Sequence, residues 1–210
     1  MARAEIEPLG DHTARGIIEF QQEPPGSSGH RTPLNRAIAR RGARAVSIEY
    51  TAEDGAGGTR DAAALARVLG RLYHAVDCTD MEAEVVRSIA QEAGIPVFCG
   101  LGCEDHPVRA FGELWTIDKA ADEAGRQIRF IGSAKADPAR AFMTAAARLG
   151  FGVETNGQGT AMRPAPFTID AGDPGCWTLR RGSTPVGQAL RLENRICLIQ
   201  ALLLWEILGP

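Results

Sequence analysis

Residues 74–99 read HAVDCTDMEAEVVRSIAQEAGIPVFC, and they predict a strand, a helix and a second strand in succession. We expect the helix over residues 81–93, because Gly94 ends it and a proline follows two residues later. His74–Cys78 and Ile95–Cys99 are short apolar runs typical of buried strands. Strands that alternate with helices favour a mostly parallel sheet with right-handed crossovers.

The same alternation extends in both directions along the chain. Upstream we expect a short helix up to about Ile18, a helix over 34–41, a strand over 45–50 and a helix over 61–72. Downstream we expect helices over 107–124, 138–149 and 192–208, strands over 127–131 and 151–154, and loops over 156–166 and 171–174. The pattern predicts an α/β protein with two open parallel-sheet αβα domains, residues 1–125 and 126–210, and a C-terminal helix 192–208 that packs across both.

Composition narrows the class of protein. The 210 residues are 44% hydrophobic and 23% charged, as in soluble globular proteins, and the net charge of −3 argues against nucleic acid as a partner. The most apolar run, 196–208, is too short to span a bilayer, so no membrane partner is expected. Five cysteines form no even disulfide framework, which favours a reducing compartment and a cytoplasmic location.

Two loops carry arginine or histidine at the start of an expected helix. One contains Ser28, His30, Arg31 and Thr32, and the other is His106-Pro-Val-Arg109. Hydroxyls, guanidinium groups and the N–H groups of a helix start can together bind phosphate or carboxylate. We expect both loops at the carboxyl edge of the sheet, where ligands of open α/β sheets bind. The alternative is a solvated loop and an ordinary helix cap.

Neither a metal nor a cofactor is predicted. Cys99-Gly-Leu-Gly-Cys103-Glu-Asp-His106 does not have the spacing of a structural zinc site. Gly132–Asp137 follows a strand but lacks the glycine spacing of a dinucleotide-binding loop.

Longer motifs carry a family resemblance. ARVLGR at 66–71, GIPVFCGL at 94–101 and HPVRAFGELWTI at 106–117 occur in the order found in ornithine and aspartate carbamoyltransferases. Phe130–Gly132 and Met143–Gly150 are similar to the first strand and helix of that family's second domain, and Leu192-Glu-Asn-Arg195 is similar to the start of its C-terminal helix. The chain therefore resembles this superfamily, most closely its ornithine branch. The resemblance implies a transcarbamylase-type fold, with 1–125 as the carbamoyl-phosphate domain and 126–210 as a shortened acceptor domain.

The resemblance also implies a set of site residues. In the family's HPxQ motif the His and Gln hold the carbamoyl oxygen and nitrogen. Here His106 is kept, but Arg109 replaces the Gln and suits an anion better than an amide. The family's acceptor loop has no match between residues 155 and 187. The implied catalytic residues are His106, Arg109 and Arg31, and the implied substrate-binding residues are Ser28, His30, Thr32, Thr79, Arg140 and Arg195.

Three functions follow from these similarities and departures. The first is a divergent transferase that binds a small anionic ligand, a phosphate or a carboxylate, in the cleft between the domains and transfers a carbamoyl or related group to an amine. The second is a non-catalytic descendant that binds an anion or a partner. The third is a structural subunit that pairs with a full-length homologue. Because the family forms trimers, we expect this chain to form a homo-oligomer, and specifically a trimer.

Overall fold

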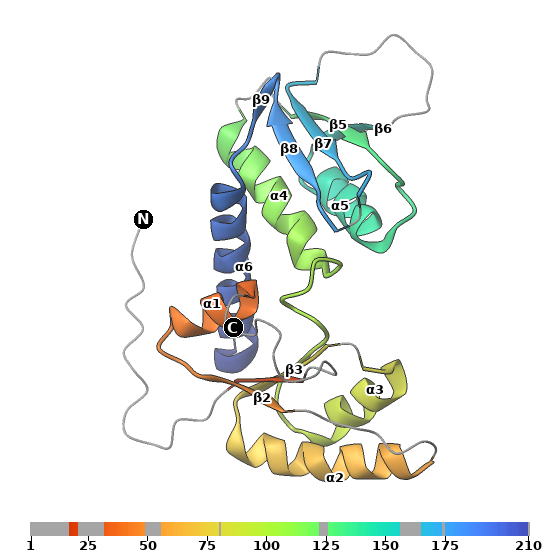
Figure 1. Cartoon of the computed structure of the whole chain (residues 1–210), viewed down its shortest axis with the longest axis vertical. Coiled ribbons are helices and arrows are strands. Elements are labelled where there is room, and N and C mark those ends of the chain that lie inside the picture. Colours follow the sequence, from red (N-terminus) through yellow and green to blue (C-terminus); the bar gives the residue numbers. More distant parts are fainter. Residues whose placement is uncertain are drawn as a thin grey trace. The chain divides into compact units, whose positions relative to one another are not determined.

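The computed structural model describes residues 17–20, 32–48, 56–79, 81–121, 126–155, 165–173 and 175–209 (Figure 1). By packing, the chain divides into two compact units. The first comprises Met1–Leu101 with Gln200–Pro210, and the second comprises Gly102–Ile199. The division into functional domains at residue 125 stays a prediction.

The first unit contains a parallel four-stranded sheet in the order β2-β1-β3-β4. Its strands are β1 (Ile17–Phe20), β2 (Ala45–Ile48), β3 (Ala75–Cys78) and β4 (Val97–Phe98). The helix predicted up to Ile18 is wrong at its end, because Ile17 and Ile18 belong to β1 and pair with both β2 and β3. Isoleucine favours strands, and the two neighbouring strands decide the outcome here.

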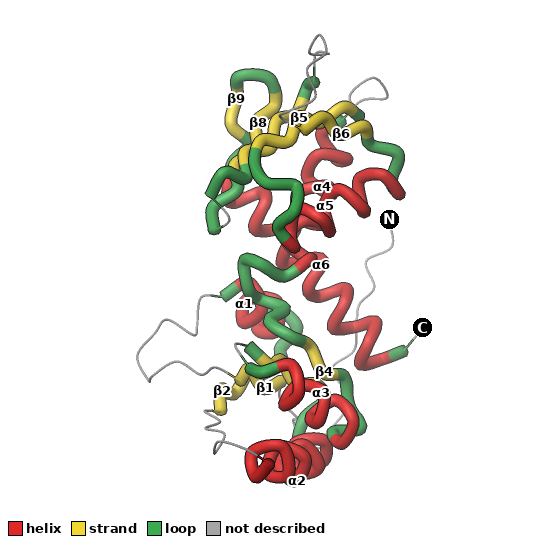
Figure 2. The backbone as a smooth tube through the Cα atoms, turned by 90° about the vertical axis from the view of Figure 1, so that its right-hand side faces the viewer, coloured by secondary structure: helices red, strands yellow, loops and turns green. Residues whose placement is uncertain are grey.

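Helices cover both faces of this sheet. Helix α1 (Pro33–Ala39) lies on one face, and α2 (Ala56–Leu72) and α3 (Ala83–Glu92) lie side by side on the other (Figures 1 and 2). Gly70 allows α2 to approach α3 closely, since a Cβ at this position would lie 1.8 Å from the carbonyl oxygen of Ala93. The chain passes from β1 to β2 on one side and then returns to β3 on the other, so the sheet has a topological switch point between β1 and β3.

The second unit contains a five-stranded sheet in the order β6-β5-β7-β8-β9. The strands are β5 (Gln127–Ile131), β6 (Gly152–Thr155), β7 (Phe167–Asp170), β8 (Thr178–Arg181) and β9 (Thr184–Pro185). Strands β5 and β6 were predicted, and they are parallel to each other and to β7, which was not predicted. Strands β8 and β9 run antiparallel and were not predicted either. Such short strands carry too few residues for a clear pattern, and Gly182, at φ +57°, makes the turn between the last two possible.

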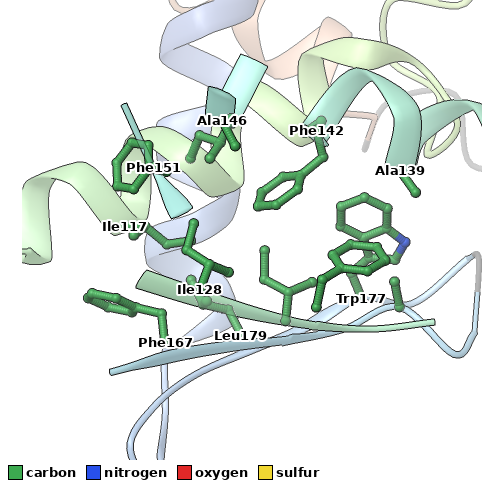
Figure 3. Packing of buried hydrophobic residues seen from close by; sticks show 14 of the residues in the cluster. Ile117, Ile128, Ala139, Phe142, Ala146, Phe151, Phe167, Trp177 and Leu179 are labelled. Atoms are coloured by element: carbon green, nitrogen blue, oxygen red, sulfur yellow. The ribbon is translucent and has the colours of Figure 1, made fainter. Parts of the chain in front are cut away.

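Helices α4 (Pro107–Ala120) and α5 (Asp137–Arg148) pack together over this second sheet. Figure 3 shows the side chains of Phe142, Ile128 and Phe151 filling the layer between helices and strands. Trp177 closes one end of this core, with its ring edge-on to Phe130 at 5.5 Å and to Phe142 at 6.0 Å between ring centroids. The region before β8 is thereby fixed to the core.

Helix α6 (Gln188–Leu208) begins one turn earlier than predicted. Its residues up to Ile199 belong to the second unit, and those from Gln200 onward belong to the first. Among the described residues, no helix combines the length and the apolar character that crossing a membrane requires.

Candidate functional site

A pocket of about 270 Å³ lies in the second unit, where α4 and α6 meet the loops that precede α4 and β8. Three arginines and two glutamates line it, so its side chains carry one more positive than negative charge. The lining residues are Glu104, Arg109, Gly112, Glu113, Gly175, Cys176, Trp177, Gln188, Arg191, Leu192 and Arg195.

His106 caps the N-terminus of α4. Its Nδ1 accepts a hydrogen bond from the Val108 N–H at 3.1 Å, and Pro107 occupies the first turn, where no N–H is needed. Burial lowers the pKa of His106 below its ordinary value, and the nearby Arg195 cation lowers it further, against the effect of Asp105. The imidazole is therefore neutral near pH 7 with its proton on Nε2, which makes it a hydrogen-bond donor at that nitrogen.

Arg109 lies one turn further along α4 and is 5% exposed. Its guanidinium donates to the carbonyl oxygens of Glu104 at 3.1 Å and Gly175 at 3.4 Å, and it forms an ion pair with the Glu104 carboxylate at 3.3 Å. The same group lies over the Trp177 ring, 5.1 Å from the centroid. Arg109 is thus held in one orientation at the wall of the pocket.

Arg195 approaches the same carboxylate from α6. Its Nη1 donates to Glu104 Oε1 at 2.6 Å, and its Nη2 donates to the carbonyl oxygens of Gly102 at 2.9 Å and Cys103 at 2.5 Å. Its Nε–H is buried and has no acceptor among the residues that the structure describes. A buried donor without a partner is rare and costly in a folded protein, so this N–H can bind a ligand oxygen.

A second ion pair joins the two helices one turn away. Arg191 of α6 binds both carboxylate oxygens of Glu113 of α4, and its Nη2 also donates to the Trp177 carbonyl oxygen at 2.7 Å. Both partners are largely buried. Next to it, Asn194 donates to Thr116 Oγ1 at 2.8 Å. This network fixes α6 against α4 and shapes the pocket.

The structure brings together three of the predicted site residues, His106, Arg109 and Arg195. Arg140 lies elsewhere on the second unit, in the first turn of α5, where it is 68% exposed and paired with Asp137. It does not line the pocket.

The other predicted residues belong to the first unit. The Thr32 hydroxyl caps α1 and accepts from the Asn35 N–H at 3.2 Å. Thr79 directly follows β3, at the carboxyl edge of the sheet beside the switch point, and its buried hydroxyl has no partner among the described residues. Ser28, His30 and Arg31 lie outside the described residues.

Of the eleven described residues that line the pocket, two were predicted site residues, Arg109 and Arg195. The missed residues that pair with or support a charge are Glu104, Glu113, Trp177 and Arg191. A signal for two of them exists in the sequence. Glu113 follows Arg109 by four residues and Arg191 precedes Arg195 by four, so each pair lies on one face of its helix. If the two helices face each other, this spacing predicts one ion pair, between Glu113 and Arg191, beside two like charges, Arg109 and Arg195. Glu104 and Trp177 lie in loops, where spacing gives no comparable signal.

Comparisons with known proteins support the relationship that the motifs suggest. No family model matches the chain. Over 90 residues it is 34% identical to the catabolic ornithine carbamoyltransferase of Burkholderia mallei. The aligned stretch covers 42% of this chain and 27% of that protein. This chain is also 36% identical over 90 residues to an ornithine carbamoyltransferase of Neisseria subflava. Here the aligned stretch covers 42% of this chain and 39% of that protein. The matches therefore span less than two thirds of these curated relatives.

Solved structures extend the similarity in fold over most of the chain. The ornithine carbamoyltransferase of Burkholderia thailandensis has a TM-score of 0.59 at 18% identity, with 94% of this chain and 86% of that chain covered. The enzyme from Pyrococcus furiosus has a TM-score of 0.52 at 20% identity, with 91% and 52% covered. A putative aspartate carbamoyltransferase from Trypanosoma cruzi has a TM-score of 0.56 at 13% identity, with 93% and 83% covered. At these identities the likeness is one of fold.

Proposed function

Since this chain belongs to the aspartate/ornithine carbamoyltransferase superfamily, we propose that it binds a small anion, a phosphate or a carboxylate, in the pocket between α4 and α6. The observation that carries the proposal is Arg195: its side chain lines a pocket with one more cation than carboxylates, and its buried Nε–H has no acceptor among the described residues. Buried guanidinium groups are favoured partners for both classes of anion, because their donors match two oxygens at once.

His106, at the start of α4, adds a chemical role beyond binding to the proposal. It is not one of the lining residues, but the Arg195 cation acts on it electrostatically, and its Nε2–H is a donor. We propose that it donates to the carbonyl oxygen of a carbamoyl or related group. When an amine nitrogen attacks that carbonyl carbon, negative charge develops on the oxygen, and a donor placed there stabilises it. The bond from carbon to the anionic leaving group then breaks, the leaving group takes the electron pair, and the amine loses a proton.

The first unit has a candidate binding residue of its own, apart from the pocket of the second unit. Thr79 lies at the switch point of its sheet, where ligands of open α/β sheets bind, and its hydroxyl has no partner among the described residues. We assign it, with Ser28, His30, Arg31 and Thr32, to ligand binding on the strength of the family resemblance. Thr32 Oγ1 already caps α1, so its contribution is expected to be the smallest.

Binding is tested by calorimetric titration of the chain with inorganic phosphate, carbamoyl phosphate, acetate and succinate. We expect wild type to bind at least one of them, and Arg195→Gln to weaken that binding at least tenfold. Arg195→Lys keeps the charge and serves as a second variant if the first folds poorly. Arg67→Gln is the matched control, because Arg67 forms a surface ion pair with Glu92 in the first unit, and its affinity is expected to stay within twofold of wild type. Absence of binding by wild type would refute the proposal.

A non-catalytic binding protein is the second candidate, and one observation favours it. Arg109 is already bound by Glu104, the Gly175 carbonyl and the Trp177 ring, so it has little freedom to follow a reacting group. Consumption of carbamoyl phosphate in the presence of an amino-acid panel separates the two candidates. Turnover that His106→Ala abolishes, with anion affinity kept within a few-fold, supports the transferase. Anion binding without any turnover supports the binding protein.

Assembly stays a prediction from the resemblance, and location stays a prediction from the cysteine content. A homotrimer is expected, and light scattering coupled to size-exclusion chromatography measures it. A cytoplasmic location is expected as well.

A further inference from the structure

We propose that the Glu104 carboxylate stands in for a carboxylate of the ligand, so that the pocket is selective for carboxylates and its ligand binds by displacing Glu104. This inference rests on the proposed function, because it names which class of anion the pocket takes.

The geometry around Glu104 is that of a carboxylate-binding site. Its Oε1 accepts from Arg195 Nη1 at 2.6 Å, and its Oε2 lies 3.3 Å from Arg109 Nη1. The two oxygens of one planar group thus bind two guanidinium groups that come from different helices. A ligand carboxylate in the same position would find the same two donors at the spacing of its own oxygens.

Burial shows which partner of this arrangement can leave. The Glu104 side chain is 53% exposed, whereas the side chains of Arg109 and Arg195 are 5% and 7% exposed. The glutamate can rotate into water with little loss of solvation, but the two cations cannot follow it. A replacement anion is then favoured, because it restores the countercharge that the two buried guanidinium groups lose with Glu104. The neighbouring Glu113 differs, since it is largely buried, like its partner Arg191, and cannot rotate into water in this way.

The surroundings of the two arginines favour a carboxylate over a phosphate. Carbonyl oxygens of Gly102, Cys103, Glu104 and Gly175 already accept from the same guanidinium groups. A phosphate dianion would bring a second negative charge and a third oxygen close to these carbonyl dipoles. A carboxylate brings one charge and two oxygens, as Glu104 does.

A free ligand can also make a bond that Glu104 does not make. Arg195 Nε–H has no acceptor among the described residues, while Glu104 binds Nη1 of the same group. The glutamate is tethered to the loop directly before α4, which restricts where its carboxylate can lie. An untethered ligand can place an oxygen on Nε as well, and this extra charge-assisted hydrogen bond favours the exchange.

Glu104→Gln tests the inference, because it removes the competing charge with little change in shape. Affinities of wild type and variant for acetate, succinate and inorganic phosphate are compared by calorimetry. In wild type Glu104 competes with the ligand, so the apparent affinity falls in proportion to the fraction of molecules whose site is open. We therefore expect the variant to bind acetate and succinate about tenfold tighter. The gain for phosphate is expected to be smaller. Asp118→Asn is the matched control, since it removes one carboxylate from an exposed ion pair of the same unit and should change no affinity by more than twofold.

Glu104→Asp is the second variant in case the first folds poorly. Its shorter side chain keeps the charge but cannot bridge both arginines, so we expect an intermediate gain in carboxylate affinity. Equal or larger gains for phosphate, or unchanged affinities in both variants, would overturn the inference while leaving anion binding intact. If neither wild type nor the variants bind any of the three anions, it is the proposed function itself that fails.

Discussion

The guanidinium carbon of Arg109 lies 5.1 Å from the centroid of the Trp177 ring, and both side chains are buried. Trp177 therefore belongs both to the aromatic core of the second unit, where it packs on Phe130 and Phe142, and to the pocket, where its ring lies under the Arg109 cation. The position of the charge depends on the packing of the core.

Trp177→Ala is expected to destabilise the protein by about 3–5 kcal/mol, because it removes a large buried side chain from the core. Urea denaturation measures the change. Trp205→Ala is the control, since Trp205 is 60% exposed and its loss should cost about 0.5 kcal/mol or less. Similar losses in both variants would contradict the role of Trp177 in the core.

Glu113→Gln is expected to cost about 3–5 kcal/mol of unfolding free energy, because it leaves the largely buried Arg191 without its countercharge. Asp118→Asn breaks an exposed pair and should cost about 0–1 kcal/mol. Chemical denaturation of the two variants under one condition provides the comparison. If the buried pair proves no more costly to break than the exposed one, the network does not fix α6 against α4.

Stability is expected to fall as the pH drops below about 6.5, the ordinary pKa of histidine. Burial and Arg195 lower the pKa of His106 in the folded chain, so in this range the unfolded chain binds a proton that the folded chain does not. The contribution of His106 to stability is fully present above its pKa in the unfolded chain. It is lost as the pH falls through its lower pKa in the folded chain.

His106→Asn should remove this part of the pH dependence, while its side chain can still cap α4. Denaturant titrations at several pH values between 5 and 7.5 measure it for both proteins. A pH dependence that is the same in the variant would show that His106 is not its source.

Gly70→Ala is expected to destabilise the first unit by about 1–3 kcal/mol, because the added Cβ would collide with the carbonyl oxygen of Ala93 and push α2 away from α3. Thermal unfolding checks this, with Gly187→Ala as the control, since a Cβ there meets nothing within 4 Å. A Gly70→Ala protein as stable as wild type would mean that the two helices can separate without cost.

The sequence was informative where a pattern repeats. Helix and strand periodicity located β3, α3 and β4, and His106 was correctly placed at the start of α4. Strand β1 was missed, because four residues carry little pattern and its pairing partners lie far along the chain.

The candidate site was only partly predictable, for a related reason. Arg109 and Arg195 could be found from motifs, but their shared partner Glu104 depends on how α6 packs against the loop before α4. Trp177 owes its role to a strand pair, β7 and β8, that the sequence pattern did not reveal.

The most direct test of the central claim follows the Arg195 Nε–H itself during a titration with succinate and, separately, with inorganic phosphate. In a nitrogen-correlated NMR spectrum, the signal is assigned by its loss in Arg195→Lys. Anion binding in the pocket predicts that this signal shifts and saturates with the calorimetric affinity of at least one of the two anions. A signal that stays in place at saturating concentrations of both would contradict an anion site at Arg195.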